Sequence, residues 1–259
     1  MSSSKPPGPS NLDNLRVVLV ATRNPLNMGA AARAMSNFGA AQLRVVHPFE
    51  VAFREARSAV GAGEVLKNAK EYATVAEAVA DCALVIGTTA AGRRELHLEL
   101  RRLESGARTI LQQLQTEPVA VLFGSEKVGL TNDDMSHCHW LMRIPTREAH
   151  GSMNLGQAVA VCLYELARAS ATTKDTKVDR RSAGTPREHS SAAKAGDMER
   201  LTRLLYDVLR VSGYVKPRAT RATEEKLRRM IRRLDLDTVD AELWLGMLRQ
   251  IQWKLAQTR

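Results

Sequence analysis

The sequence predicts an α/β protein with a parallel sheet, followed by a smaller helical domain. Short apolar runs of strand length alternate with alanine-rich stretches of helical spacing in the first two thirds of the 259 residues. Strands that alternate with helices in this way form parallel sheets. In the last third, apolar residues instead recur every three or four positions, as they do on amphipathic helices.

Five apolar runs are expected to be strands. Most are continuous rather than alternating, which is typical of strands covered on both faces of a sheet. They span residues 17–21, 43–46, 82–86, 119–123 and 140–144. Helical spacing lies between them at 29–38 and 75–79. A longer helix opens near Leu155 and is apolar almost all round as far as Ala167, so we expect it to contact both its own sheet and a partner subunit.

The C-terminal third is predicted to be a tethered helical domain. Residues 171–196 contain no apolar side chain larger than valine, which predicts a flexible linker. The first helix follows with leucine and valine at helical spacing over 201–209, and Gly213 is its expected end. A second helix covers 227–234, and a third begins near Thr238.

These patterns divide the chain into four segments. Residues 1–13 have no apolar core that a secretory signal would need, so we expect a disordered tail on a cytoplasmic protein. The sheet domain is expected at 14–170, the linker at 171–196 and the helical domain at 197–259. No apolar run approaches the roughly 18 residues of a membrane span, and none is expected.

The positive charge is concentrated near the C-terminus. The formal net charge is +10. Residues 1–170 hold 18 Lys and Arg against 16 Asp and Glu, a balance of +2, whereas residues 171–259 hold 20 against 12, a balance of +8. Such an excess is typical of a polyanion-binding domain, because neutralising phosphates releases condensed counterions. A basic face that is merely solvated is the alternative, and charge alone leaves both readings open.

The three cysteines and two nearby histidines are predicted to be structural. Cys82, Cys138 and Cys162 lie in or beside apolar segments, and their odd number and wide spacing argue against a disulfide framework. Cys138 has His137 and His139 as direct neighbours. Three adjacent residues do not match a common zinc spacing, so no metal site is predicted.

Three short segments place Gly, Asn or Pro where a strand should lead into a helix. The first contains Asn27, Gly29 and Arg33, with Arg33 one helical turn beyond Gly29 on nearly the same face. Taken alone, this segment is explained better by an N-cap asparagine and a surface arginine than by a functional site.

The second and third segments follow the later strands. Two glycines at 124 and 129 enclose Glu126, at the strand end where open α/β sheets bind ligands. This pattern matches neither the dinucleotide fingerprint nor a Walker P-loop. The third segment is Ile144 and Pro145, then a polar loop, then Ser152-Met-Asn-Leu155 at the start of the long helix.

Together, these segments resemble the three motifs of the TrmH-like SPOUT RNA ribose methyltransferases. The ordered set is Asn-x-Gly-x-x-x-Arg, Phe-Gly-x-Glu-x-x-Gly-Leu, and Ile-Pro followed by Ser-x-Asn-Leu, over roughly residues 14–170. Thr88-Thr-Ala90 and the tethered helical extension are most similar to the TrmJ branch. Those bacterial enzymes methylate the ribose of nucleotide 32 in the tRNA anticodon loop.

The resemblance implies a Rossmann-like parallel sheet with a C-terminal trefoil knot, an exception to the rule that chains avoid threading. It also implies a homodimer with its sites at the interface, and S-adenosylmethionine bound within the knot. The residues that match the family's cofactor contacts are Thr88, Thr89, Ala90, Gly124, Ile144, Ser152, Met153 and Leu155.

Arg33 matches the family's catalytic arginine, with Asn27 beside it and with Glu126 and Asn154 as organisers of the site. Arginine side chains stay protonated in proteins and are poor general bases. We therefore expect Arg33 to hold a phosphate and stabilise the developing ribose oxyanion. The residues expected to contact RNA are Arg23, Arg93, Arg94, Arg228, Arg229, Arg232 and Arg233.

One position departs from the pattern, and three other functions compete with tRNA methylation. Ala91 stands where TrmJ relatives commonly carry an arginine, which affects a local RNA contact more than methyl transfer. The same chemistry on ribosomal RNA is compatible with the motifs. A non-catalytic RNA-binding homologue is disfavoured by the presence of Arg33 and Asn154, and a nucleotide-binding Rossmann enzyme by the missing phosphate fingerprint.

Overall fold

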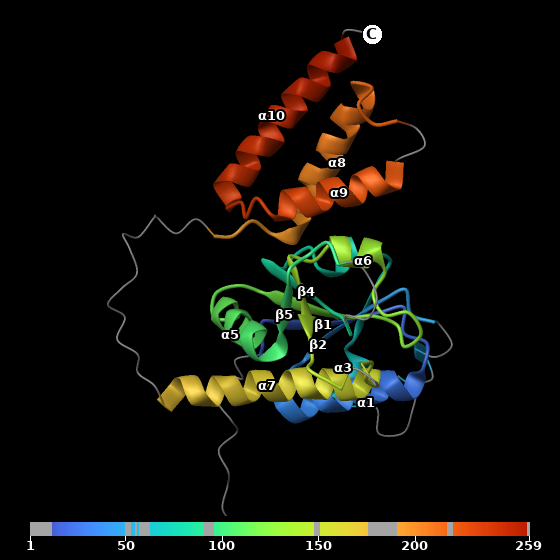
Figure 1. Ribbon diagram of the computed structural model, residues 1–259, viewed down its shortest axis with the longest axis vertical. Coiled ribbons are helices and arrows are strands. Elements are labelled where there is room, and N and C mark those ends of the chain that lie inside the picture. The colour runs from blue at the N-terminus through green and yellow to red at the C-terminus, as the bar shows by residue number, and fades with distance from the viewer. Residues whose placement is uncertain are drawn as a thin grey trace, which may run out of the picture.

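The protein consists of a sheet domain and a helical domain stacked on it (Figure 1). The computed structural model describes residues 12–49, 53, 54, 56, 63–90, 96–147, 151–175, 191–216 and 220–257. Among these residues, no helix has the length and apolar character that crossing a bilayer requires.

A seven-stranded sheet forms the centre of the first domain. Its strand order is β3-β2-β1-β6-β4-β7-β5, and every neighbouring pair is parallel. The strands are β1 (Leu15–Val20), β2 (Gln42–Val46), β3 (Lys70–Tyr72), β4 (Leu84–Thr88), β5 (Leu100–Arg102), β6 (Val119–Phe123) and β7 (Trp140–Arg143). The predicted α/β class and its parallel sheet are confirmed. Threading of the chain into a knot does not follow from strand order and stays a prediction.

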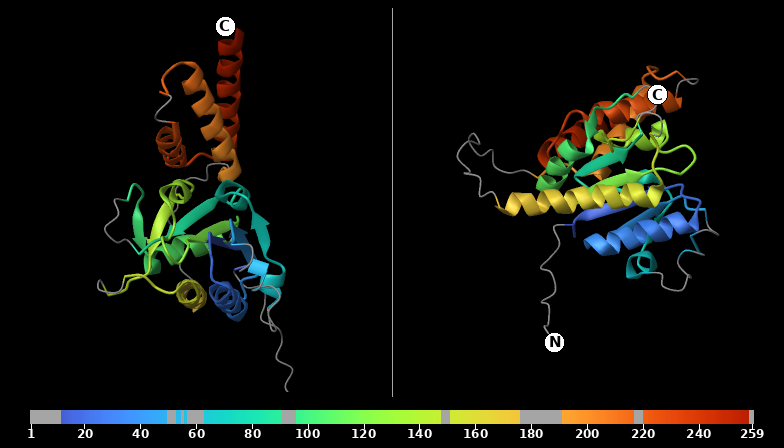
Figure 2. Two further views of the ribbon diagram at one scale, coloured as in Figure 1. Left: turned by 90° about the vertical axis from the view of Figure 1, so that its right-hand side faces the viewer. Right: turned by 60° about the horizontal axis from the view of Figure 1, so that its bottom comes forward.

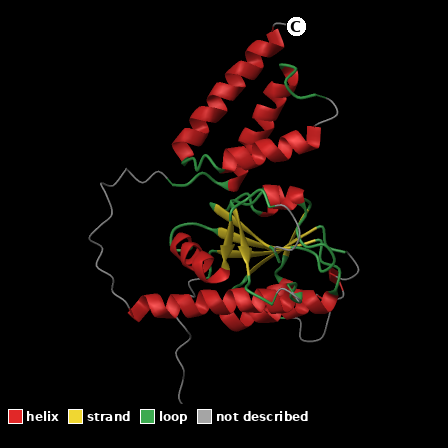
Figure 3. Cartoon of the chain, viewed as in Figure 1, coloured by secondary structure: helices red, strands yellow, loops and turns green. Residues whose placement is uncertain are grey.

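Helices cover both faces of this sheet (Figure 3). One face packs in a core with α1, α3, α5 and α7, and the other packs with α4, α6 and the first residue of α8. The helices of this domain are α1 (Pro25–Phe38), α3 (Glu64–Lys67), α4 (Val75–Ala78), α5 (Leu103–Gln113), α6 (Asn132–Ser136) and α7 (Leu155–Asp175).

All five predicted strands are present, but two further strands lack an apolar signal. These are β3 and β5, each three residues long, and they form the two edges of the sheet. Both contain charged side chains, and the three residues of each are exposed or half-buried. Short, charged strands are typical of sheet edges, where they prevent pairing with another chain.

Local sequence signals define the ends of α1 and bring it close to α7. The Asn24 side chain accepts a hydrogen bond from the Leu26 amide, Pro25 occupies the first turn, and Gly39 ends the helix at φ 76°. A Cβ on Gly156 would lie 2.6 Å from the Cβ of Ala30. The glycine therefore lets the start of α7 cross α1 at close range.

The helical domain has its own apolar core, formed mainly by Met198, Leu201, Ile231, Leu245 and Leu248. Its helices are α8 (Ala195–Val211), α9 (Thr220–Arg232) and α10 (Thr238–Gln257). In Figure 2, α8 and α10 run side by side, as their contacts also indicate.

Both ends of the predicted linker, 171–196, are corrected by the structure. Helix α7 continues to Asp175. At the other end, Ala193 and Ala195 are buried, and their amides donate to the carbonyls of Leu236 and Cys82. Small residues can pack closely without large apolar side chains, so the composition gave no sign of this order. Residues 176–190 lie outside the described part of the chain.

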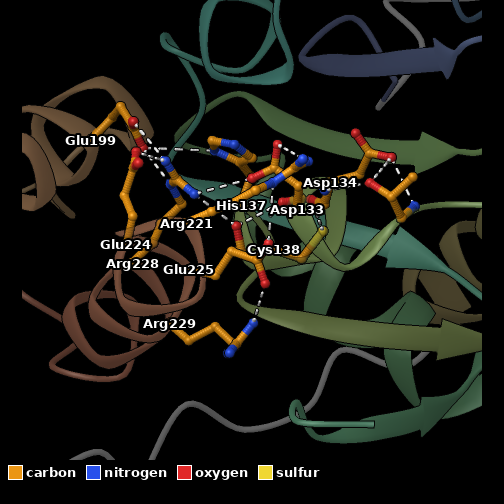
Figure 4. A network of polar contacts seen from close by, with 12 residues as sticks. Asp133, Asp134, His137, Cys138, Glu199, Arg221, Glu224, Glu225, Arg228 and Arg229 are labelled. Atoms are coloured by element: carbon orange, nitrogen blue, oxygen red, sulfur yellow. Dashed lines mark hydrogen bonds and ion pairs between the residues drawn. The ribbon is translucent and has the colours of Figure 1, made fainter. Parts of the chain in front are cut away.

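A buried arginine joins the two domains (Figure 4). Within the helical domain, Arg228 on α9 donates to both carboxylate oxygens of Glu199 on α8, at 2.8 and 3.1 Å, and to Glu224 at 2.7 Å. Across the domain boundary it donates to the Ser136 hydroxyl at 3.0 Å and approaches Asp133 at 3.4 Å. Both acceptors belong to α6 of the sheet domain.

The charges of this network stabilise one another. Burial disfavours the ionised form of Glu199, but the hydrogen bonds and positive charge of Arg228 outweigh it and lower the pKa of that carboxyl. Burial also opposes the charge of Arg228, whereas Glu199 raises the pKa of that guanidinium. Each side chain therefore favours the charged form of the other.

Removal of Arg228 is expected to destabilise the whole chain. Arg228→Ala leaves the buried Glu199 with the longer contact to Arg203 at 3.4 Å, and loss of a buried partner typically costs about 3 kcal/mol or more. Urea unfolding followed by circular dichroism measures this loss. Arg233→Ala removes an exposed arginine just beyond α9 and serves as the matched control. Equal stability of the two variants would contradict a structural role for Arg228.

Candidate functional site

The candidate site is a cavity of about 610 Å³ at the carboxyl ends of β4, β6 and β7. This volume lies within the range of small-molecule sites, and ligands bind at this end of the strands in open α/β sheets. Apolar walls from Met142, Ile144 and Leu155 are combined with hydroxyl, amide and backbone groups. The cavity can therefore enclose an apolar ring and hydrogen-bond a polar end.

All three sequence segments reach this cavity. The predicted site residues among its lining are Asn27, Thr88, Thr89, Ala90, Gly124, Glu126, Ile144, Ser152, Met153, Asn154 and Leu155. These residues come from segments up to 128 positions apart, so their meeting is a property of the fold. Their individual roles are not decided by proximity and stay proposals.

The loop after β6 is too tight for a side chain at Gly124. A Cβ there would lie 2.0 Å from the carbonyl carbon of Gly129 and 2.1 Å from the amide nitrogen of Leu130. The loop closes on itself because Ser125 and Gly129 form an antiparallel bridge, with Gly129 at φ 68°. Gly124 is therefore required because a Cβ has no room there, and Gly129 because its positive φ is unfavourable for other residues.

We expect Gly124→Ala to open this loop and abolish ligand binding at the cavity, because a methyl group cannot enter a space of 2 Å. Isothermal titration with S-adenosylmethionine or S-adenosylhomocysteine measures the loss. Gly29→Ala is the control, since nothing lies within 4 Å of a Cβ at that position and alanine favours the helix. Binding by the Gly124 variant at the level of the control would contradict the steric argument.

Glu126 holds the segment between β1 and α1. Its carboxylate accepts hydrogen bonds from the amides of Arg23 and Asn24, both at 3.3 Å, and from the Asn27 side-chain amide at 2.9 Å. Burial raises the pKa of the Glu126 carboxyl, but these donors outweigh it and lower the pKa below its ordinary value. Glu126 is therefore an anionic anchor, and a poor proton acceptor.

Asn27 extends this contact to the third segment. Its side-chain oxygen accepts from the Asn154 amide at 2.8 Å. The Asn154 oxygen in turn accepts from the backbone amides of Gly156 and Gln157, which begin α7. One chain of hydrogen bonds thus runs from the β6 loop through α1 to the start of α7.

The remaining cavity residues are held by the sheet. The Thr88 hydroxyl donates to the Leu122 carbonyl at 2.8 Å, and the Thr89 amide donates to the Met142 carbonyl at 3.0 Å. The Thr146 hydroxyl donates to the Gly151 carbonyl at 3.2 Å, which ties the loop after β7 to the segment that precedes α7. Neighbouring strands therefore determine where these side chains lie.

The sequence pattern missed several cavity residues, among them Ser125, Lys127, Val128, Met142 and Thr146. Ser125, Lys127 and Val128 lie between the two motif glycines, so the Gly-x-Glu-x-x-Gly spacing was the signal that could have found them. Thr146 directly follows the Ile-Pro pair. Met142 gave no signal beyond its place in an apolar strand.

Arg33 and Arg23 lie outside the cavity lining. Arg33 is exposed on α1 and is six positions beyond Asn27, nearly two helical turns away. Arg23 is also exposed, although Glu126 holds its backbone amide. Both are accessible to a large ligand that approaches from outside. Arg93 and Arg94, like Ala91, lie outside the described residues.

The expected basic face of α9 is corrected by the structure. Arg228 and Arg232 are only 5% and 4% exposed, so they are unable to form an RNA-contacting surface. Arg229 is largely buried and pairs with Glu225, whereas Arg233 is exposed. The face opposite the leucines is covered because α9 packs against α6.

Arg232 has no ionic partner in the part of the chain that the structure describes. None of its guanidinium nitrogens has a hydrogen-bond partner among the described residues, and burial lowers its pKa to about 10. Its long side chain therefore packs at the boundary between the domains, and this packing requires the burial of a charge.

The histidine and cysteine side chains near α6 point into separate environments. His137 lies 3.7 Å from Glu199 at the domain boundary, whereas His139 accepts a hydrogen bond from the Val85 amide at 3.0 Å. Burial lowers the pKa of both imidazoles to about 3. All three cysteines are buried, as expected from their apolar surroundings, and burial raises the pKa of Cys138 to about 12.

The cavity and the sheet around it lie in a segment of the chain that matches a known protein family. The profile described as the SpoU rRNA Methylase family matches residues 14–164, more than half of the chain. The chain belongs to the SpoU methylase family. The predicted methyltransferase resemblance is therefore confirmed, and the matched range contains all three sequence segments.

The similarity to individual relatives extends beyond this range. The tRNA (cytidine/uridine-2'-O-)-methyltransferase TrmJ of Pectobacterium atrosepticum is 35% identical over 243 residues, with 93% of this chain and 98% of the relative covered. TrmJ of Yersinia pestis is 35% identical over 245 residues, covering 93% and 92%. The crystal structure of TrmJ from Z. mobilis ZM4 matches with a TM-score of 0.76 at 29% identity, covering 92% and 98%. The likeness to TrmJ therefore includes the helical domain.

Proposed function

We propose that this protein transfers a methyl group from S-adenosylmethionine to the ribose 2'-hydroxyl of tRNA, at nucleotide 32 of the anticodon loop. The observation that supports this proposal is one cavity that is lined by residues from all three family motifs. The tRNA substrate is supported by similarity to TrmJ enzymes over 93% of the chain. The assignment to nucleotide 32 rests on the TrmJ likeness alone.

The cavity suits S-adenosylmethionine in size and in chemistry. Gly124, Thr88 and Thr89 offer backbone groups at close range, and Ile144, Leu155 and Met142 form an apolar wall. Gly124 lines the cavity, and a Cβ there would collide with the loop at Gly129 and Leu130. Ser152 and Met153 complete the expected contacts. When bound, this cofactor supplies the methyl group from a sulfonium.

The chain's own residues position the reaction. Glu126, Asn27 and Asn154 hold the loops that shape the cavity, and the lowered pKa of Glu126 suits an anchor rather than a base. Exposed Arg33 is available to grip the phosphate beside the target ribose with two parallel hydrogen bonds. The same cation stabilises negative charge that develops on the ribose oxygen.

We also propose a homodimer that acts in the cytoplasm, with its contact along α1 and α7. These two helices pack together on one face of the sheet domain. Tyr164 of α7 is 56% exposed and meets Phe38 of α1 edge to face, so apolar surface is present on both helices. A partner on this face would lie beside Arg33, which the cavity of a single chain does not include.

Labelled methyl transfer to purified tRNA and rRNA tests the reaction. We expect incorporation into tRNA, at a ribose in the anticodon loop. Arg33→Ala should lower kcat/KM by about 100-fold or more, the magnitude lost with one oxyanion-stabilising group. S-adenosylmethionine affinity should stay unchanged. Arg108→Ala, at an exposed arginine on α5, is the control.

The alternatives have distinct outcomes in the same assay. Incorporation into rRNA alone would favour the ribosomal substrate, and incorporation into neither RNA would favour a non-catalytic binding protein. Arg33→Lys separates two roles, because lysine is easier to deprotonate but lacks the planar fork. Full turnover by the lysine variant would argue against the phosphate grip.

The helical domain is proposed to bind tRNA through arginines that remain exposed. Arg210, Arg233 and Arg249 are exposed, whereas Arg228 stabilises the domain boundary. Deleting residues 197–259 would also remove Arg228 from Ser136 and expose the buried His137. Point substitutions therefore report on RNA binding more cleanly than truncation.

We expect Arg233→Ala combined with Arg249→Ala to weaken tRNA binding and to reduce its salt dependence. Each lost phosphate contact lowers the slope of log K against log salt by about one. Filter binding at several salt concentrations measures this slope. An unchanged slope and affinity would leave the domain a structural role only.

A further inference from the structure

Helix α10 exposes a ridge of apolar side chains. Val239, Leu243, Met247 and Ile251 follow one another at intervals of four residues, and each is between 42% and 64% exposed. The buried side of the helix, with Leu245 and Leu248, packs along α8. Figure 1 and the left panel of Figure 2 show α10 extending away from the sheet domain. An apolar surface of this kind marks a site of association.

The ridge is symmetric in sequence about Met247. Leu243 and Ile251 lie four residues to either side of it, and Val239 and Leu255 lie eight residues to either side. An antiparallel copy of the helix centred on Met247 would therefore place Leu243 opposite Ile251 of the copy on both sides of the axis. Residues four apart turn by about 40° around the helix, so Val239 and Leu255 lie at the margins of the contact. Rows of side chains four residues apart are the surfaces that pack helices together.

The charged residues of α10 also favour antiparallel pairing of two copies of the helix. Its first ten residues, 238–247, carry Asp240 and Glu242 and no basic residue. Its last ten, 248–257, carry Arg249 and Lys254 and no acidic residue. Antiparallel pairing brings the acidic half of each helix beside the basic half of the other, whereas parallel pairing brings like charges together. The antiparallel arrangement is favoured for this reason.

We propose that α10 pairs antiparallel with α10 of a second copy of this chain, with Met247 on the twofold axis. A contact in which the same surface is used by both partners is the usual interface of symmetric dimers. RNA is a poorer occupant, because the acidic first half of the helix repels phosphates and an aliphatic ridge offers them no donors. This contact is separate from the one proposed along α1 and α7, so it would join such dimers to one another, and it does not depend on the enzymatic activity.

Oxidative cross-linking of the full-length protein tests the pairing. Met247→Cys places two thiols face to face across the axis, and we expect a covalent dimer on mild oxidation. Trp253→Cys is the matched control, because Trp253 is 54% exposed on the same helix but lies off the ridge. The native cysteines are buried and contribute little background. The yield at position 247 should exceed that at 253 by at least tenfold.

A mixing experiment tests the direction of the helices. Leu243→Cys and Ile251→Cys should each cross-link poorly alone but well when the two variants are mixed, because the antiparallel register places 243 beside 251. Efficient cross-linking of Leu243→Cys alone would indicate parallel helices and overturn the proposed register. Circular dichroism establishes that each variant is folded.

Two further outcomes would reject a second copy as the occupant. Equal yields at positions 247 and 253 would indicate random collisions. Absence of cross-linking at 247, with the thiol still reactive toward a maleimide, would show that no copy of the chain covers the ridge. If the proposal holds, Met247→Glu should raise the dissociation constant of the α10 contact at least tenfold, measured by concentration-dependent light scattering as the association of the α1/α7 dimers into larger species.

Discussion

The geometry of the candidate site depends on one carboxylate. Glu126 accepts hydrogen bonds from two backbone amides and one side-chain amide of the segment that leads into α1. Through Asn27 and Asn154, the same network reaches the start of α7. A neutral side chain of the same shape has only one acceptor oxygen and could not satisfy donors on both sides. The carboxylate of Glu126 thus makes hydrogen bonds within the chain that hold three loops around one cavity.

The short helix α6 connects this cavity with the helical domain. It begins with a capping box at Thr131, directly after Leu130, which lines the cavity. Two and five residues later, Asp133 and Ser136 contact Arg228 of α9. The β6 loop and the domain boundary therefore share a helix of five residues. A second contact across this boundary is the hydrogen bond from the Ala195 amide to the Cys82 carbonyl.

The fold class could be predicted from the sequence because it follows from short local patterns, and most cavity residues could be predicted because three motifs resemble those of a known family. Continuous apolar runs identified all five central strands, and Gly213, at φ 81°, ends α8 where a stop was expected. The edge strands were missed because pairing at an edge requires no apolar residues. The role of Arg228 was also missed. Its spacing on α9 is the same for a solvated face and for one that packs against α6, and only tertiary structure distinguishes them.

This distinction changes what the net charge of the chain implies about RNA. Part of the basic excess in the last third consists of arginines that are paired or buried, such as Arg228 with Glu199. Formal charge therefore overstates the surface available to phosphates. By contrast, the cavity is lined mostly by backbone groups, hydroxyls and apolar side chains, with Glu126 and Lys127 as its charged residues, while the exposed cations Arg23 and Arg33 lie outside it. A mostly uncharged wall beside exposed cations suits a small ligand enclosed by the protein and a polyanion held against its surface.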